Sequence, residues 1–294
     1  MSTIPIILHP TDFSEPAGRA LNLAGSLAHR EGARLLVLHV ANTLTDAVNV
    51  LLDDPSPDRQ RQRLEQLQLE VPGVPFESRL AFGGAAAEIL KTAQETGCDL
   101  IVMGTRGRKG LGRLLMGSVA EQVVRNALCP VVTVNSPSRE PAVQAEVSSG
   151  TAAPIRTVLH PTDFSGPCAE AFRVACELAG DQSARLTVVH VAVSPPIAPI
   201  NQPVPPPLPE DPRGKLEELL RLAQASAPGL QADYRVEKGD AAPRIVSAAQ
   251  EMRCDLIVMG THGRTGLGRV LMGSVAEQVL RTAPCPVVTV RARR

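Results

Sequence analysis

Residues 103–118 have the sequence MGTRGRKGLGRLLMGS, and residues 259–274 repeat it as MGTHGRTGLGRVLMGS. An apolar run precedes each copy, at 100–102 and at 256–258, and the residues VAEQV follow each copy. These flanks predict a buried strand before each glycine-rich loop and a helix after it. Glycines let the backbone approach an anion, and the loop N–H groups and the helix dipole favour negative charge. The sequence therefore predicts a phosphate cradle, present twice.

Both copies share the spacing Gly-x2-Gly-x9-Gly-Ser and carry basic residues inside the loop. A tight structural turn is the alternative, because Ser118 with Glu121, and Ser274 with Glu277, match a capping box with the serine as N-cap. The chain contains neither the Walker order GxxxxGK[ST] nor the dinucleotide order GxGxxG. The sequence therefore supports neither of those two phosphate sites.

The composition is that of a folded protein of about two domains, with 294 residues, 44% hydrophobic and 20% charged. A net charge of zero and 2% aromatic residues argue against a nucleic-acid surface. The sequence contains no run of 18 apolar residues, so it predicts no membrane-spanning helix, and the N-terminus lacks the features of a signal peptide. The cysteines are Cys98, Cys129, Cys168, Cys176, Cys254 and Cys285, without a C-x-x-C pair. We expect buried thiols and a cytoplasmic protein.

Short apolar runs alternate with segments of helical periodicity through the first half of the chain. The expected strands cover residues 4–8, 33–40, 76–82, 98–103 and 130–134, and the expected helices lie between 14 and 32, at 58–69, at 85–96 and at 118–128. Ser14 is the expected N-cap of the first helix, and Gly32 and Gly97 are expected to end two of the helices. The alternation predicts a parallel sheet with helices on both faces.

The second half of the chain repeats the first. The sequence LHPTDFS at 8–14 returns unchanged at 159–165, and the segment 98–134 agrees with 254–290 at 31 of 37 positions. A Pro-rich segment at 195–212 accounts for the extra length of the second half, as a plain insertion or as a lid. Residues 135–153 are the expected linker. We therefore expect two whole domains, at 1–138 and 154–294.

The glycine spacing and its duplication resemble the ATP-binding branch of the universal stress protein family, with two family domains in one chain. The resemblance implies two Rossmann-like, doubly wound, five-stranded parallel sheets in strand order 3-2-1-4-5. It also implies that the fifth strands pair within the chain as a pseudo-dimer. In this strand order, ligands bind at the switch point between the first and fourth strands.

The resemblance also implies one nucleotide site per domain. Pro10, Thr11 and Asp12 would face adenine and ribose, Val40 would meet adenine through its backbone, and Gly104, Arg106, Gly107, Gly117, Ser118 and Val119 would surround the phosphates. The second site would use Pro161, Thr162, Asp163, Val191, Gly260, His262, Gly263, Gly273, Ser274 and Val275. Arg106 stands where the other copy has His262, so we expect the two affinities to differ. Asx-type capping of the first helix is an alternative role for Asp12.

The function that follows is that of an ATP-binding regulatory protein in stress response or energy sensing, with an unknown protein partner. Mg²⁺ or Mn²⁺ would arrive with the phosphates, held partly by Ser118 or Ser274. Slow ATP hydrolysis is one alternative, although no general base is evident. A metal-binding stress protein is another alternative, because His9 and His39 would end adjacent strands, and His160 and His190 would repeat this arrangement. However, two imidazoles are too few for a closed zinc site, which needs four ligands. A further homodimer of whole chains stays open.

Overall fold

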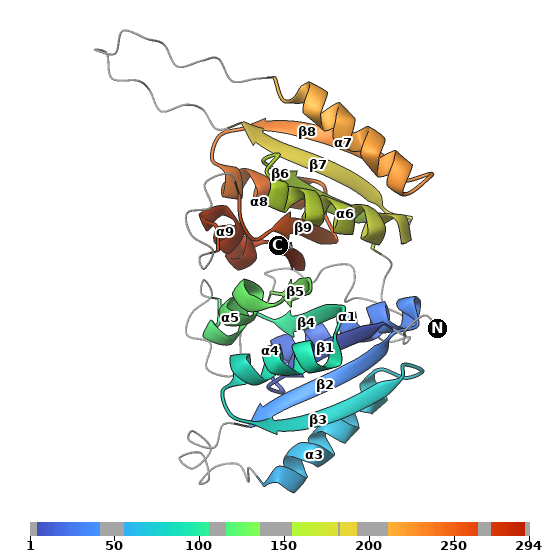
Figure 1. Cartoon of the computed structure of the whole chain (residues 1–294), viewed down its shortest axis with the longest axis vertical. Helices are drawn as coiled ribbons and strands as arrows, with labels where there is room; N and C mark the ends of the chain where they lie inside the picture. The colour runs from blue at the N-terminus through green and yellow to red at the C-terminus, as the bar shows by residue number, and fades with distance from the viewer. Residues whose placement is uncertain are drawn as a thin grey trace, which may run out of the picture.

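The computed structural model describes residues 5–41, 56–105, 116–135, 155–181, 183–192, 211–263 and 272–291. Its strands form one ten-stranded sheet in the order β3-β2-β1-β4-β5-β10-β9-β6-β7-β8. Figure 1 shows the two halves following one another along the long axis, each with helices on both faces of its part of the sheet. Each half has the order 3-2-1-4-5, which confirms the predicted doubly wound fold.

Across the described residues, the helices and strands of the two halves correspond one to one, except that the 3-10 helix η1 of the first half has no counterpart in the second. The first half contains β1 (Ile6–Thr11), α1 (Glu15–Glu31), β2 (Arg34–Ala41), α3 (Pro57–Gln66), the 3-10 helix η1 (Leu67–Glu70), β3 (Phe76–Phe82), α4 (Ala85–Thr96), β4 (Leu100–Gly104), α5 (Ser118–Asn126) and β5 (Val131–Val134). The second half contains β6 (Thr157–Thr162), α6 (Gly166–Asp181), β7 (Arg185–Ala192), α7 (Arg213–Ser226), β8 (Ala232–Lys238), α8 (Ala241–Glu251), β9 (Leu256–Gly260), α9 (Ser274–Thr282) and β10 (Val287–Val290).

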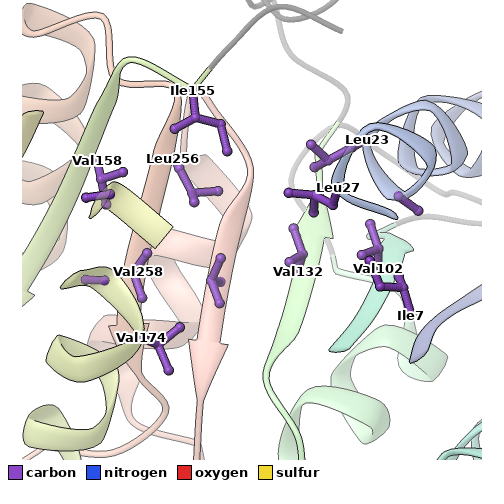
Figure 2. Close-up of a cluster of buried hydrophobic side chains, with 14 of the residues drawn as sticks. Ile7, Leu23, Leu27, Val102, Val132, Ile155, Val158, Val174, Leu256 and Val258 are labelled. Atoms are coloured by element: carbon purple, nitrogen blue, oxygen red, sulfur yellow. The ribbon is translucent and has the colours of Figure 1, made fainter. Parts of the chain in front are cut away.

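Two apolar layers, one on each face of the sheet, hold the helices in place. Alternate strand residues such as Ile7 and Val102 pack with α1 and the corresponding helix α6 on one face. The intervening residues, such as Leu8 and Ile101, pack with α4, α5 and their counterparts on the other. Both faces are covered, so most residues of the central strands are apolar and buried. Figure 2 shows side chains of the first layer drawn from both halves.

The halves join through β5 and β10, which pair antiparallel with Val132 opposite Val288. The hydroxyl of Thr133 donates to the carbonyl of Val287 at 3.2 Å, and the hydroxyl of Thr289 donates to the carbonyl of Val131 at 3.2 Å. These paired bonds relate the two strands by a local twofold axis. The predicted pairing of fifth strands within the chain is therefore confirmed.

The first strand is longer than the sequence predicts. It continues to Thr11, because Pro10 and Thr11 pair with β2. The pairing of β1 with β4 covers only Ile7 and Leu8. Proline has no backbone N–H to donate, and none is required of Pro10 on the side that faces β4. The polar helix expected at 58–69 is α3 followed by η1. Most of the expected linker and of the Pro-rich segment lies outside the described residues.

Candidate functional site

The carboxyl ends of β1 and β4 bring two distant loops to one place. The two strands are parallel neighbours, with Leu8 opposite Ile101, and β6 and β9 repeat the pairing with Leu159 opposite Ile257. The chain leaves β1 toward β2 and leaves β4 toward β5, on opposite sides. Such a switch point opens a crevice at the carboxyl ends of the strands. The Asp-bearing turn and the glycine loop both begin there.

In the second half, the two loops are in direct contact. A Cβ atom placed on Gly263 would lie 2.6 Å from Oδ2 of Asp163. No side chain fits at that distance unless the carboxylate moves. A larger residue at position 263 would therefore displace the Asp163 carboxylate from the glycine loop. Its counterpart Gly107, together with Arg106, lies outside the described residues.

The turn after β1 is held by its own side chains. Oγ1 of Thr11 accepts the N–H of Phe13 at 3.0 Å, and Oδ1 of Asp12 accepts the N–H of Ser14 at 3.1 Å. Phe13 has a φ of 61°, which is unusual for a bulky residue. Asp12 thus forms an Asx turn that leads into Ser14, but the helix itself is capped by Ser14 and not, as the alternative role supposed, by Asp12. A carboxylate has several acceptor positions, so this bond does not exclude a ligand.

The second turn repeats this geometry and adds a thiol. Thr162 accepts from Phe164 at 3.1 Å, and Oδ1 of Asp163 accepts from Ser165 at 3.0 Å. The thiol of Cys168 also donates to Oδ1 of Asp163, at 3.0 Å. Burial, together with this bond, raises the pKa of Cys168 to about 11. The corresponding residue of the first half is Ala17, so this contact distinguishes the two sites.

A backbone bond closes the base of each glycine loop. The N–H of Gly117 donates to the carbonyl of Thr105 at 2.8 Å, and the N–H of Gly273 donates to that of Thr261 at 2.9 Å. The N–H of Thr105 is in turn bound to the carbonyl of Val134 at 3.1 Å. The start of α5 is thereby fixed beside the end of β4. The sequence did not indicate these roles for Thr105 and Thr261, although both stand inside the duplicated stretch.

The capping-box expectation for Ser118 and Ser274 is wrong. The N-caps are Gly117 and Gly273, with φ values of −67° and −64°, and no side chain caps either helix. The bond to the Thr105 carbonyl holds Gly117 extended, which places Ser118 at the first helical position. The N–H groups of a first helical turn have no acceptor within the helix. The starts of α5 and α9 therefore present backbone donors that no cap side chain covers.

The acidic residue in the first turn of each helix is paired. Glu121 contacts Arg125 at 2.6 Å, and Glu277 contacts Arg281 at 3.2 Å. The carboxylates thus lie against cations one turn further along the helix. This pairing reduces the repulsion that an anion at the helix start would meet.

Gly104, Pro10 and Val40 lie at or near the carboxyl ends of three neighbouring strands. A Cβ atom on Gly104 would lie 3.0 Å from the carbonyl carbon of Pro16, so this glycine lets α1 approach β4. Pro10 is buried at the end of β1. Val40 lies within β2, one residue beyond His39, which is opposite Thr11. Their counterparts Pro161, Val191 and Gly260 occupy the same positions on β6, β7 and β9.

The four strand-end histidines bind backbone carbonyls. Nδ1 of His9 lies 2.8 Å from the carbonyl of Val102, and Nδ1 of His39 lies 2.8 Å from that of Thr11. His160 and His190 repeat these bonds at 2.8 and 2.9 Å. Burial lowers the pKa of His9 and of His160 to about 4. Within the described ranges, no group of three or more His, Cys, Asp or Glu residues is placed to hold a metal ion.

Two further features of the site were not foreseen. The ring of Phe13 packs against His39 at a tilt of 46°, with centroids 4.6 Å apart, and the guanidinium of Arg63 lies 4.2 Å from the Phe13 centroid. In the second glycine loop, Nδ1 of His262 lies 2.9 Å from Oγ1 of Thr261. Nε2 of His262 is buried and has no hydrogen-bond partner among the residues that the structure describes.

The comparisons with known proteins agree with this fold. The model of the universal stress protein family matches residues 3–135 and 154–291. A universal stress protein of Thermus aquaticus is 39% identical over 132 residues, 44% of this chain and 96% of that protein. A universal stress protein of Mycolicibacterium smegmatis is 29% identical over 251 residues, 80% of this chain and 78% of that protein. The crystal structure of a universal stress protein from Archaeoglobus fulgidus superposes with a TM-score of 0.71 at 22% identity, covering 97% of this chain and 98% of that one.

Within the described part of the chain, none of the helices combines the length and apolarity needed to cross a membrane.

Proposed function

The chain belongs to the universal stress protein family, and on that premise we propose that each half binds one adenine nucleotide, ATP, at its switch point. The bound nucleotide would serve regulation in the stress response, through binding and not through turnover. The observation that carries the proposal comes from the second half, where the glycine loop approaches the Asp163 carboxylate at Gly263 and lies against Gly273, the N-cap of α9. A carboxylate accepts bonds from ribose hydroxyls, and uncovered backbone donors favour phosphates.

The residues divide between the two ends of the ligand. Pro10, Thr11, Asp12 and Val40 would hold the adenosine, and Gly104, Arg106, Gly107, Gly117, Ser118 and Val119 would surround the phosphates. In the second site the adenosine group is Pro161, Thr162, Asp163 and Val191, and the phosphate group is Gly260, His262, Gly263, Gly273, Ser274 and Val275. The exposed hydroxyls of Ser118 and Ser274 are available to a Mg²⁺ or Mn²⁺ ion that enters with the phosphates.

The second site fits an anion in two respects. Gly273 lies against the base of the glycine loop, where a Cβ would make ordinary contacts, the nearest at 3.5 Å to the Thr261 carbonyl, and it has no side chain that a ligand would have to displace. The buried Nε2 of His262 has no partner among the described residues, and a phosphate oxygen would supply one. Arg106 replaces this imidazole in the first site with a permanent cation. We therefore expect the first site to bind phosphates more tightly.

The decisive experiment measures bound nucleotide directly. Freshly purified protein is denatured and the released small molecules are identified, and nucleotide-free protein is then titrated with ATP by calorimetry. We expect up to two ATP molecules per chain. A folded protein that binds none would refute the proposal. Measuring ADP in the same samples, against a variant with both Gly117→Val and Gly273→Val, distinguishes binding from slow hydrolysis.

The cellular setting belongs to the same proposal. All six cysteines are free thiols, which suits the reducing cytoplasm. A regulatory nucleotide-binding protein needs a protein partner that distinguishes the loaded from the unloaded state. Pull-down with and without ATP, using the double variant as control, would identify such a partner.

A further inference from the structure

Two cysteines lie in contact at the amino ends of the central strands, opposite the carboxyl ends where the nucleotide site is proposed. Cys98 precedes β4 and Cys129 precedes β5, so both stand at the amino ends of neighbouring parallel strands. Their sulfur atoms are 3.5 Å apart and share a hydrogen bond. A disulfide bond is about 2.05 Å long, so the sulfurs need to approach by only about 1.5 Å.

The backbone around both cysteines is anchored. The N–H of Cys98 donates to the carbonyl of Ala93 at 3.1 Å, and the carboxylate of Asp99 accepts the N–H of Ile6 at 2.8 Å. The carbonyl of Pro130 accepts the N–H of Ile101 at 3.0 Å. These bonds fix the two strand starts next to each other. Side-chain rotation is therefore the movement by which we expect the sulfurs to meet.

We propose that Cys98 and Cys129 form an oxidisable dithiol that closes to a disulfide when hydrogen peroxide is the oxidant. Cys129 is partly exposed and Cys98 is buried. Cys129 is therefore the sulfur that peroxide reaches first. Cys98, held against it, is the resolving thiol. This is a modification site separate from the nucleotide sites, and it does not depend on them.

The reaction proceeds in two balanced steps. The thiolate of Cys129 attacks one peroxide oxygen, the O–O bond breaks, and the departing hydroxide takes up a proton as water. The sulfur of Cys98 then attacks the resulting sulfenic acid, the S–S bond forms, and the S–O bond breaks. The Cys98 proton leaves with that hydroxide as a second water. The two sulfurs together lose two electrons, which the peroxide accepts.

The hydrogen bond between the thiols favours this order of attack. It lowers the pKa of Cys129, because the S–H of Cys98 stabilises the Cys129 thiolate, and it raises the pKa of Cys98. The thiolate is the nucleophilic form of cysteine. Attack therefore begins at the sulfur that is both more exposed and more readily ionised.

The second half provides a matched control pair. Cys254 and Cys285 occupy the equivalent positions before β9 and β10. Their exposed fractions are 7% and 3%, so both sulfurs are shielded from peroxide. Burial raises the pKa of Cys254 to about 12 and that of Cys285 well above its ordinary value. The proposal therefore predicts oxidation of the first pair only.

The test uses the full chain, treated with hydrogen peroxide and then mapped by mass spectrometry of non-reduced peptides. We expect a Cys98–Cys129 cross-link to form at least about tenfold faster than a Cys254–Cys285 cross-link. The bond would close a ring around β4, the glycine loop and α5, so oxidation should raise the melting temperature by several degrees. Dithiothreitol should reverse both changes.

Two variants assign the roles of the sulfurs. In Cys98→Ser, Cys129 should stop at the sulfenic acid, which dimedone traps. In Cys129→Ser, neither a cross-link nor a dimedone adduct should form at Cys98. Cys285→Ser is the control and should oxidise at Cys98 and Cys129 as the native chain does. The proposal is overturned if Cys98 and Cys129 stay unlinked in the native chain, or if the buried pair oxidises as fast.

Discussion

Single glycines of the duplicated stretch have separate physical roles. Gly104 lets a helix approach its strand, and Gly263 leaves space for the carboxylate of Asp163. Gly117 and Gly273 have negative φ values that any residue adopts, so backbone strain does not require glycine at either position. The role that we propose for these two residues lies in front of the helix start, where glycine places no side chain in the path of a ligand. That is where the proposed phosphates lie.

The variant Gly273→Val tests this role. The φ of −64° and the nearest contact of 3.5 Å accommodate a Cβ atom, and valine is a less favourable N-cap than glycine. We expect ATP affinity at the second site to fall at least about tenfold, or about 1.4 kcal/mol, because the branched side chain blocks the phosphates. Gly117→Val should do the same at the first site alone. Calorimetry measures binding, and thermal melting of nucleotide-free protein is the control.

A different pair of results would contradict the proposed role of this glycine. Retained binding together with a large fall in melting temperature would show that the glycine serves the turn alone. The phosphate cradle would then lose its main support.

The buried histidines His9 and His160 should make the protein sensitive to acid. Their pKa values in the folded protein are about 4, against 6.5 for an exposed imidazole. Between pH 4 and 6.5, the unfolded chain therefore binds more protons than the folded protein. The free energy of unfolding should therefore fall as the pH drops from 6.5 to about 4, and it should change little below that. The loss should be on the order of 3 kcal/mol for each ring. Urea unfolding at a series of pH values measures this loss. His160→Asn should remove part of the slope, and an unchanged slope would contradict the assignment.

At the scale of elements, local signals predicted much of what the structure contains. Ser14 caps α1, and Gly32 and Gly97 end α1 and α4 in the left-handed conformation, as expected. The cap of α5 was mispredicted because it is set by the bond between Gly117 and Thr105, which joins the two ends of the glycine loop. Propensity and short motifs contain no information on that bond. The contact of Asp163 with Gly263 is similarly non-local.

The packing of α1 on β4 depends on Gly104. A Cβ at this position would lie 3.0 Å from backbone atoms of Pro16, which cannot rotate away. Gly104→Val should therefore push the first turn of α1 off the sheet and cost about 1–3 kcal/mol of unfolding free energy. Urea denaturation measures this loss, with Gly18→Ala, where an added Cβ meets nothing within 4 Å, as the control. An unchanged midpoint for Gly104→Val would mean that α1 is not held as described.

At the scale of the whole molecule, the edges of the continuous sheet, as far as the described residues go, are β3 and β8. Both carry charged side chains, including Glu77 and Arg79 on β3 and Arg235 and Glu237 on β8. Charges on edge strands oppose pairing with further chains. The apolar strands β5 and β10 are instead covered by each other. The duplication in the sequence predicted this pairing only through the resemblance to a family, since nothing local in VVTV specifies a partner.

The register of β5 and β10 makes a specific prediction about the separated halves. Val132 faces Val288, its own counterpart, and Val131 faces Thr289, the counterpart of Thr133. The same ladder would therefore form between two copies of β5, as an isologous interface. We propose that residues 1–138 and 154–294 each fold as a domain. The isolated first domain would otherwise expose Val132 and Val134, which are 2% and 5% exposed in the whole chain.

Expressed alone, residues 1–138 should therefore sediment as a dimer, and residues 154–294 should do the same. When the two fragments are mixed, they should exchange into a complex of one copy of each, because the opposing strands have the same sequence. The matched control adds the second fragment to the full-length chain, whose β5 is already paired with β10, and no complex is expected. Analytical ultracentrifugation distinguishes these species, and circular dichroism confirms that each fragment is folded. A folded, monodisperse monomer of residues 1–138 would show that the exposed strand does not drive association, and the β5–β10 ladder would then be a consequence of the covalent linkage between the halves.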